Sequence, residues 1–295
     1  MDKPLILLVG KNGQVGWELA RCLQPLGEVM ALGRTELDLA DAAAIAACIA
    51  LQRPDVIVNA AAYTAVDKAE SESELAFRVN AAAPAALAKA AKACDALLVH
   101  YSTDYVFDGS RAGAYREDDA TGPRSAYGRS KLAGEQAIAA SGARHLIIRT
   151  SWVYGLHGAN FMNTMLRLGR RSSETGDELR VIGDQVGAPT WTRHLADATA
   201  AVLVRQDGPS GLYHLAAGGE TSWHSYAEAI FSEAQATGLM DRTPVVRRIT
   251  SADYPLPAKR PTNSRLDCAK IRRDFNLTLP DWRIGLADCL ADSRF

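Results

Sequence analysis

The first half of the chain alternates short apolar runs with helical stretches rich in alanine. The run Leu5–Val9 is apolar throughout, as a parallel strand buried on both faces requires. Further strands are predicted at Val29–Leu32, Asp55–Asn59, Ala96–Tyr101 and His145–Thr150. The helices between them are predicted at Gln14–Leu26, Ala42–Leu51, Leu75–Ala93 and Tyr127–Ala140, and Pro84 should break or kink the third. This alternation predicts parallel pairing through right-handed crossovers.

The pattern changes after residue 150. Two helical stretches, Asn160–Arg171 and Trp223–Thr237, are separated by loops that contain Gly and Pro. Arg193–Val204 followed by Leu212–Ala216 again resembles a helix and a strand of the first sheet. We therefore predict a smaller, discontinuous C-terminal domain for the substrate. The predicted division is 1–151 and about 181–218 for the dinucleotide-binding domain, and about 152–180 and 219–295 for the substrate-binding domain.

A glycine-rich segment, Gly10-Lys-Asn-Gly13-Gln-Val-Gly16, leads from the first strand directly into a helix. Without a Cβ, these positions allow a tight turn, close approach of the backbone to a pyrophosphate, and close packing of helix on strand. The amides at the helix start would then face the phosphates. Because a strand precedes the turn and a helix follows it, we predict a Rossmann-like doubly wound parallel sheet. The expected cofactor contacts are Gly10, Asn12, Gly13, Gln14, Val15 and Gly16.

The end of the second strand bears on the choice between NADH and NADPH. An acidic residue there would hold the ribose 2′-hydroxyl of NAD, whereas arginine accommodates the 2′-phosphate of NADP. The strand ends in Leu32-Gly33-Arg34-Thr35, with Glu36 and Asp38 nearby. Arg34 therefore favours NADPH and leaves NADH open. The segments expected beside the adenine, ribose and pyrophosphate are Asp38-Leu39 and Ala60-Ala61-Ala62.

Two short motifs carry candidate chemistry. Tyr127 and Lys131 lie four residues apart at a predicted helix start, so their side chains share a face. An ammonium near a phenol lowers the pKa of the phenol, and we expect the pair to deliver a proton near neutral pH. Tyr101-Ser-Thr103-Asp104 ends the fourth strand, at the edge where open α/β sheets bind ligands. Thr103 is our choice to bind the same substrate oxygen, with Ser102 as the rival.

Composition and charge exclude several classes of function. The 295 residues include 33 Lys and Arg against 34 Asp and Glu, which leaves no general attraction to nucleic acid or to an anionic membrane. Leu5–Val9 is too short for the core of a signal peptide, and no run approaches the roughly 18 apolar residues of a membrane span, so we expect a cytoplasmic protein. The five cysteines and six histidines are dispersed. We therefore expect no metal site and interpret the histidines as structural or surface residues.

The glycine turn together with Thr103, Tyr127 and Lys131 resembles the extended short-chain dehydrogenase/reductase family. Within it, further blocks are similar to those of dTDP-4-dehydrorhamnose reductases. These blocks are Gly10–Trp17, Asn59–Asp67, Tyr101–Asp108, Arg149–Tyr154, Asp184–Pro189 and Arg260–Arg265. They are spread over nearly the whole chain.

The resemblance implies an NADPH- or NADH-dependent oxidoreductase that reduces the 4-keto group of dTDP-4-dehydro-β-L-rhamnose to give dTDP-L-rhamnose. Tyr127 would protonate the C4 oxygen, Lys131 would hold the nicotinamide ribose, and Thr103 would position the carbonyl. The implied sugar contacts are Thr103, Asp104, Tyr127 and Trp152. Arg260 and Arg265 could supply planar donors to the diphosphate of the substrate.

Some members of this family dimerise through magnesium held by glutamates at the interface. The segment Thr190-Trp-Thr-Arg193 offers no carboxylate, so magnesium is doubtful, and both a monomer and a homodimer are left open. Two other functions compete with the reductase. One is a nucleotide-sugar epimerase of the same fold with a permanently bound cofactor, and the other is a non-catalytic, cofactor-binding regulatory subunit. The complete set of Thr103, Tyr127 and Lys131 argues against the regulatory subunit.

Overall fold

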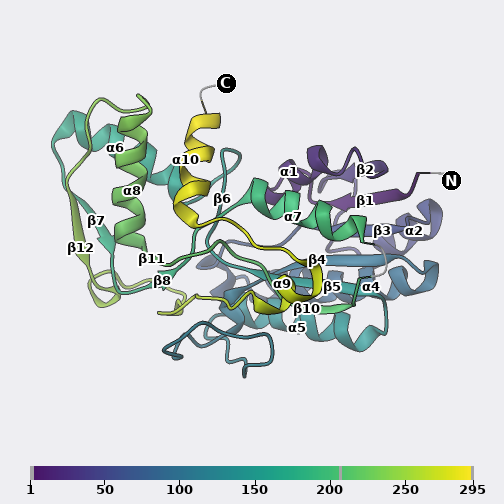
Figure 1. The fold of residues 1–295 in the computed structure, drawn as a ribbon. Coiled ribbons are helices and arrows are strands. Elements are labelled where there is room, and N and C mark those ends of the chain that lie inside the picture. The colour runs from purple at the N-terminus through teal and green to yellow at the C-terminus, as the bar shows by residue number, and fades with distance from the viewer. Residues whose placement is uncertain (1–2, 206–207, 294–295) are drawn as a thin grey trace.

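A six-stranded parallel sheet forms the centre of the computed structural model, which describes residues 3–205 and 208–293 (Figure 1). Its strand order is β10-β5-β4-β3-β1-β2. The strands are β1 (Leu5–Val9), β2 (Glu28–Leu32), β3 (Val56–Asn59), β4 (Leu97–Thr103), β5 (His145–Thr150) and β10 (Gly211–His214), and their pairs are all parallel. The predicted strands of the first half are confirmed, as is the return of the chain to this sheet near residue 212. The order reverses between β1 and β3, where open sheets of this kind form a ligand crevice.

Helices cover both faces of the sheet, so the doubly wound arrangement is confirmed. Successive side chains of β1 alternate between two apolar clusters: Ile6 and Leu8 join one, and Leu7 and Val9 join the other. The first cluster is completed by α1 (Gln14–Cys22), α7 (Thr192–Val204) and α9 (Ala269–Phe275). The second is completed by α2 (Ala42–Gln52), α4 (Ala83–Cys94) and α5 (Ala126–Ser141). Burial on both faces explains why these strands are continuously apolar.

The interruption predicted at Pro84 is confirmed. The expected helix 75–93 divides into α3 (Ser73–Phe77), a π-helical turn η2 (Arg78–Ala82), and α4, which carries Pro84 in its first turn. Proline has no backbone N–H to donate, and the first turn of a helix does not need one.

The second half of the chain adds a smaller region, drawn at the left of Figure 1, with its own apolar cluster. Its helices are α6 (Phe161–Thr175), α8 (Trp223–Ala236) and α10 (Trp282–Asp292). Three short strand pairs accompany them: β7 (Leu179–Ile182) with β12 (Val246–Ile249), β8 (Val186–Gly187) with β11 (Thr221–Ser222), and β6 (Val153–Tyr154) with β9 (Thr190–Trp191). Three single 3₁₀ turns are η1 (Lys68–Glu70), η3 (Asp104–Val106) and η4 (Ser251–Asp253).

The domain boundaries stay a prediction. Helix α9 falls in the range 219–295 that was assigned to the smaller domain, yet Ile271 and Phe275 pack in the apolar cluster of the large sheet. The C-terminal chain therefore returns to the large sheet before α10. In the described ranges, no helix has both the length and the apolar character needed to cross a membrane.

Candidate active site

A cavity of about 790 Å³ opens at the carboxyl ends of β1, β3 and β4. This volume lies in the upper part of the range of cavities that bury most of a small-molecule ligand. Sequence-predicted site residues that line it are Gly10, Asn12, Gly13, Gln14, Val15, Arg34, Asp38, Leu39, Ala60, Ala61, Ala62, Thr103, Asp104, Tyr127, Lys131 and Trp152. Segments far apart in the chain thus meet in one cavity. Gly16, Arg260 and Arg265 are not part of its lining.

The glycine turn has the close packing that its sequence predicts. Gly10 has a φ of 94°, and a Cβ on it would lie only 2.6 Å from the amide nitrogen of Ala61. A Cβ on Gly16 would lie 2.0 Å from the carbonyl oxygen of Gly10, so any side chain there would push α1 away from β1. Backbone therefore lines the cavity beside the start of α1, which suits a phosphate group.

Arginine and carboxylate side chains beyond β2 differ in what they contact. Glu36 accepts hydrogen bonds from Lys11 Nζ at 2.7 Å and from the amide of Gly33 at 2.8 Å. These contacts, the lysine first, lower the pKa of Glu36 to about 2. Asp38 lines the cavity, and its Oδ1 accepts a hydrogen bond from the amide of Ala40. Arg34 lines the same cavity, at the position where a 2′-phosphate is expected.

A segment of the smaller region, residues 155–160, contacts the glycine turn. His157 Nε2 lies 3.1 Å from the carbonyl oxygen of Asn12, and the imidazole stacks on Trp17 with ring centroids 4.5 Å apart. Asn160 Nδ2 donates to Oε1 of Gln14 at 2.9 Å. This segment therefore closes the cavity at the side of the turn.

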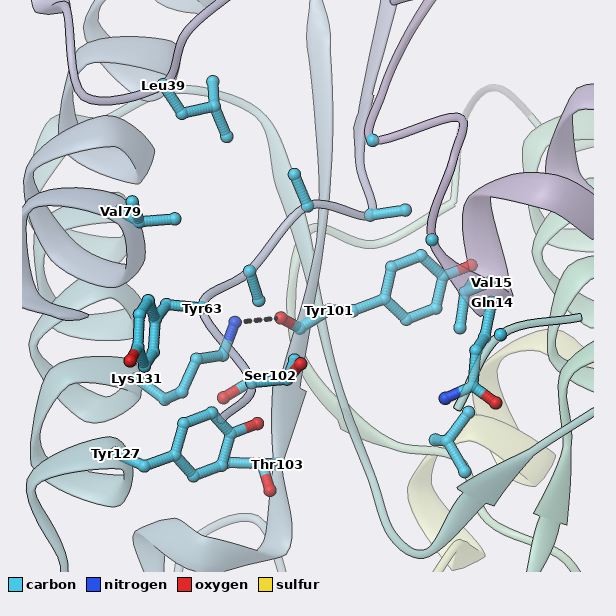
Figure 2. Close-up of a pocket in the computed structure, with 18 of the residues that line it drawn as sticks. Gln14, Val15, Leu39, Tyr63, Val79, Tyr101, Ser102, Thr103, Tyr127 and Lys131 are labelled. Carbon is cyan, nitrogen blue, oxygen red and sulfur yellow. Dashed lines mark hydrogen bonds between the residues drawn. The ribbon is translucent and has the colours of Figure 1, made fainter. Parts of the chain in front are cut away.

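Helix α5 brings Tyr127 to the end of β4. Ser125 caps the helix by accepting a hydrogen bond from the amide of Gly128 at 3.1 Å, which sets Tyr127 in the first turn. In Figure 2, Tyr127 extends from this helix toward Thr103, Lys131 extends toward the carbonyl oxygen of Tyr101, and Gln14 lies across the cavity. The Thr103 hydroxyl lies near the phenol of Tyr127 and acts to lower its pKa.

Thr103 and Ser102 differ in their contacts. Thr103 Oγ1 donates to Asp104 Oδ1 at 3.1 Å and accepts from the amide of Tyr105 at 3.2 Å. Ser102 lines the same cavity, and its buried Oγ has no hydrogen-bond partner among the described residues. Both residues therefore line the cavity, and Thr103 is the one that acts on the pKa of Tyr127.

The pKa of Tyr127 moves in the direction opposite to the one expected. Burial raises the pKa to about 12, while the Thr103 hydroxyl opposes the rise and Asp104 adds to it. The sequence-based expectation of a lowered pKa is therefore wrong, because burial dominates and Lys131 is engaged elsewhere. Lys131 Nζ donates to the carbonyl oxygen of Tyr101 at 2.6 Å and lies 3.3 Å from His100 Nε2.

Burial also acts on Lys131, which is 2% exposed. It lowers the pKa of the lysine to about 8, although Glu135, one turn along α5, opposes this change. Glu135 is itself held by Arg149 of β5 at 2.6 Å, and both of these side chains are buried. Lys131 can therefore gain or lose its proton close to neutral pH.

Asp104 lines the cavity and carries a buried carboxylate oxygen. The residue is 3% exposed, and burial raises its pKa to about 6, which the hydroxyls of Ser264 and Thr103 oppose. Its Oδ2 atom has no hydrogen-bond partner among the described residues. A buried carboxylate oxygen in this state fits a ligand that brings a hydroxyl group.

Trp152 lies against a second tryptophan. Its φ is 49°, in the left-handed region, and its indole stacks on that of Trp223 with ring centroids 3.5 Å apart. Gly187 is so close that a Cβ on it would lie 2.6 Å from Cε2 of the same ring. Trp223 thus covers one face of the Trp152 indole, and that face is not available to contact a sugar in the cavity.

The two arginines expected at the substrate diphosphate are paired with carboxylates. Arg260 contacts both oxygens of Asp67, at 3.0 and 2.7 Å. Arg265 contacts Glu220 at 2.8 Å and also donates to Asn263. Their role toward a diphosphate stays a prediction. In the described part of the chain, no group of three or more His, Cys, Asp or Glu side chains could hold a metal ion.

Comparison with known proteins places this arrangement in a family. The sequence model described as the RmlD substrate binding domain matches residues 4–295. This chain belongs to the RmlD substrate binding domain family.

Two relatives and one solved structure are similar over nearly the whole length. A dTDP-4-dehydrorhamnose reductase of Shigella flexneri is 49% identical over 288 residues, which cover 95% of each chain. Another, from Burkholderia thailandensis, is 46% identical over 296 residues, or 97% of this chain and 98% of that one. The crystal structure of dTDP-4-dehydrorhamnose reductase from Bacillus anthracis in complex with NADP has a TM-score of 0.90 at 34% identity, covering 98% of this chain and 99% of that one. The family resemblance of the motifs is confirmed.

Trp223 and His100 are among the residues that sequence reasoning missed at the site of this RmlD-family chain. Trp223 lines the cavity beside Trp152, but only the fold brings α8 to the end of β5. His100 contacts Lys131, although it was interpreted as structural or surface like the other histidines. Its position inside the buried strand β4 is the one signal that could have drawn attention to it.

Proposed function

We propose that this chain reduces the 4-keto group of dTDP-4-dehydro-β-L-rhamnose to dTDP-L-rhamnose at the expense of NADPH. One observation carries the proposal. Tyr127, Thr103 and Lys131 line the same cavity as the glycine turn. A proton donor, a hydroxyl that can hold the substrate oxygen, and a dinucleotide-binding turn are the groups that carbonyl reduction needs. The reductases that are nearly half identical to this chain support the same substrate.

NADPH is the favoured cofactor, with NADH possible. The residues present fit a dinucleotide, because backbone of the glycine turn lines the cavity and Arg34 reaches it. When bound, NADPH supplies the hydride that adds to C4 of the sugar. The Bacillus anthracis relative is described in complex with NADP. We assign Asp38, Leu39 and the Ala60–Ala62 segment to its adenosine and pyrophosphate side.

Tyr127 is the proposed proton donor. Its pKa of about 12 keeps the phenol protonated at neutral pH, so it can give its proton to the C4 oxygen as negative charge develops there. Carbon C4 gains a hydride and its oxygen gains a proton, which balances the reduction of a ketone to an alcohol. Thr103 turns its hydroxyl hydrogen from Asp104 to the same oxygen and orients it. Lys131, as an ammonium, stabilises the phenolate that remains.

The sugar is held by groups at the other side of Thr103. Asp104 Oδ2 is free to accept from a sugar hydroxyl, and the Trp152 indole offers an N–H and an apolar edge. Arg260 and Arg265 serve the diphosphate in this proposal only if the substrate replaces Asp67 and Glu220 as their partners. A cytoplasmic location and the choice between monomer and homodimer stay predictions.

The test is NADPH oxidation with freshly generated dTDP-4-dehydrorhamnose, repeated with NADH. We expect one NADPH consumed for each sugar converted, and a lower kcat/KM with NADH. An epimerase would consume no cofactor at steady state. A regulatory subunit would keep its biological activity when Tyr127→Phe abolishes turnover. Absence of activity with both cofactors would refute the reductase assignment.

A further inference from the structure

His100 is a buried histidine beside the proposed catalytic lysine that the mechanism above does not use. Along β4, Val99 and Tyr101 join the apolar cluster on one face of the sheet, and His100 therefore points to the opposite face. It is 1% exposed and does not line the cavity. Its ring lies between Asn59 of β3 and Lys131 of α5.

The amide of Asn59 fixes which ring nitrogen of His100 accepts a hydrogen bond. Asn59 and His100 are register partners on neighbouring strands. Asn59 Oδ1 accepts from the amide of Ala61 at 3.1 Å, so its Nδ2 group is the one that faces His100 Nδ1, at 3.0 Å. Because Nδ2 can only donate, His100 Nδ1 must accept.

The proton of His100 is then located on the other nitrogen. Burial lowers the pKa of His100 well below its ordinary value, and the charge of Lys131 lowers it further, so the ring is neutral. A neutral imidazole that accepts at Nδ1 carries its hydrogen on Nε2. Nε2 lies 3.3 Å from Lys131 Nζ.

We propose that His100 is a positioning residue whose Nε2–H, oriented by Asn59, points at Lys131 Nζ and favours the amine form of the lysine over the ammonium. The inference rests on the proposed function, since Lys131 matters here as the partner of Tyr127. A donor aimed at Nζ forms a hydrogen bond with the lone pair of the amine, and it opposes an ammonium, which has only donors. Lys131 keeps the carbonyl oxygen of Tyr101 as its acceptor in both forms.

Other charged groups around Lys131 act against His100 or are already neutralised. Glu135 on α5 raises the pKa of Lys131, but Arg149 of β5 pairs with that carboxylate. Tyr127 and Asp104 line the cavity with Lys131, but neither is among the groups that shift the pKa of the lysine. His100 therefore adds to the effect of burial and keeps Lys131 exchanging its proton near neutral pH. A lysine in this state can return the proton that the phenol gives up in each turnover.

Imidazole ¹⁵N NMR of the ligand-free protein tests the orientation of His100 without any assay of activity. We expect a neutral ring with its proton on Nε2 that does not titrate around pH 6.5, assigned by its loss in His100→Asn. Asn59→Asp should move the proton to Nδ1, because a carboxylate only accepts. A His100 ring that carries its proton on Nδ1 in the wild-type protein would overturn the proposal.

The pH profile of kcat/KM tests the effect on Lys131. In the wild type we expect activity to fall above pH 8, as Lys131 loses its proton. His100→Asn keeps an amide near Asn59 but is too short to reach Nζ, so this fall should move up by about 0.5–1 pH unit. Asn59→Asp should move it in the same direction.

A matched control is His145→Asn, at the start of β5 and outside the cavity, which should leave the profile unchanged. Unchanged profiles in both His100→Asn and Asn59→Asp would show that His100 is only a packing residue. The two proposals fail separately. A wild-type protein without reductase activity removes the proposed function, whereas the NMR result still decides the orientation of His100.

Discussion

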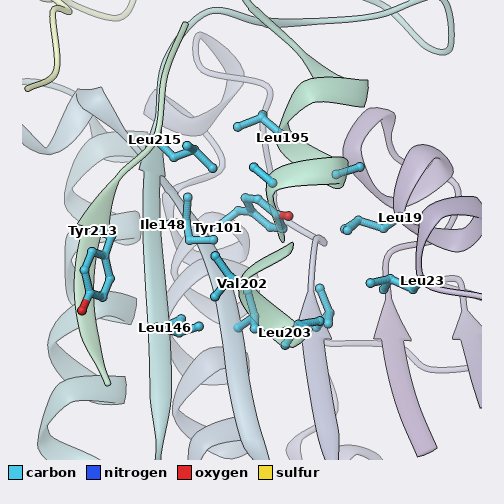
Figure 3. Packing of buried hydrophobic residues seen from close by; sticks show 14 of the residues in the cluster. Leu19, Leu23, Tyr101, Leu146, Ile148, Leu195, Val202, Leu203, Tyr213 and Leu215 are labelled. Carbon is cyan, nitrogen blue, oxygen red and sulfur yellow. The ribbon is translucent and has the colours of Figure 1, made fainter. Parts of the chain in front are cut away.

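The two faces of β4 bury polar groups in opposite ways. On one face, Tyr101 packs among aliphatic side chains of α1 and α7, including Leu19 and Leu195 (Figure 3). Its hydroxyl meets Thr199 Oγ1 at 2.5 Å, and burial raises its pKa above the usual range. On the other face, His100 and Lys131 are also buried, but they are linked by hydrogen bonds that run from Asn59 through His100 to Lys131 at the cavity.

The difference shows what burial contributes at each place. Tyr101 also lines the cavity, but its hydroxyl is paired with Thr199, so its shifted pKa has no chemical consequence. The pKa of Lys131 is shifted by the same physical cause, and its ammonium lies at the cavity with Tyr127. We therefore expect substitutions on the apolar face to change stability and substitutions on the polar face to change activity.

The largest effect is expected for Tyr127→Phe. This change removes the proton donor and keeps the ring, so kcat should fall by roughly 100- to 10,000-fold. NADPH affinity, measured by fluorescence titration, should stay within about threefold, since the lost hydroxyl is only one of many contacts with the cofactor. Wild-type turnover in this variant would contradict the assignment of catalysis to the face of β4 that carries His100 and Lys131.

Leu195→Ala is the corresponding change on the apolar face. Leu195 is fully buried in the cluster around Tyr101, and its truncation should lower the free energy of unfolding by about 2–5 kcal/mol. Urea denaturation measures this loss. At 25 °C, kcat/KM should equal that of the wild type. A large drop in kcat without a loss of stability would contradict the assignment of stability to the apolar face of β4 and of activity to the polar face.

Thr103→Val should reduce kcat about 10- to 100-fold. The change replaces a hydroxyl by a methyl group of similar size, so it removes the hydrogen bond to Asp104 and the donor to the substrate oxygen. Ser102→Ala is the matched comparison, and its effect should be smaller, because the Ser102 hydroxyl has no hydrogen-bond partner among the described residues and does not act on the pKa of Tyr127. A larger loss of kcat in Ser102→Ala than in Thr103→Val would show that Ser102, rather than Thr103, binds the substrate oxygen.

The smallest effect, and one opposite in sign to Leu195→Ala, is expected for the stability of Lys131→Met. The pKa of Lys131 falls from an ordinary 10.5 to about 8 on folding, so below pH 8 the folded protein must keep a charge in a buried site. Removing the lysine should therefore raise the free energy of unfolding at pH 7, on the order of 1 kcal/mol. The gain should shrink as pH rises from 8 toward 10.5. Denaturant unfolding at pH 7 and pH 10 checks both statements, and a loss of stability at pH 7 would refute them.

Local patterns were enough to predict most of the sheet and the glycine turn. The turn followed from a strand, a spacing and a helix that are all contiguous in sequence, and Gly10 and Gly16 have the close contacts expected of them. The pKa of Tyr127 could not be predicted, because burial depends on how η3, α5 and β4 pack together. Similarly, nothing in the sequence around Arg260 indicates that Asp67 is its partner.

Long-range packing also explains why Trp223 and His100 were missed. Trp223 reaches the cavity only because α8 folds back against Trp152. His100 contacts Lys131 because β4 and α5 lie side by side, which a scan for metal-ligand spacing does not address. Both are single residues whose role depends on a neighbour distant in the chain.

A crystal structure of the complex with NADP⁺ and dTDP-L-rhamnose is the most direct test of the central claim. We predict the C4 oxygen of the sugar within about 3.2 Å of both the Tyr127 hydroxyl and Thr103 Oγ1, with the nicotinamide against the same carbon. A sugar bound with its C4 oxygen away from these two hydroxyls would contradict the account.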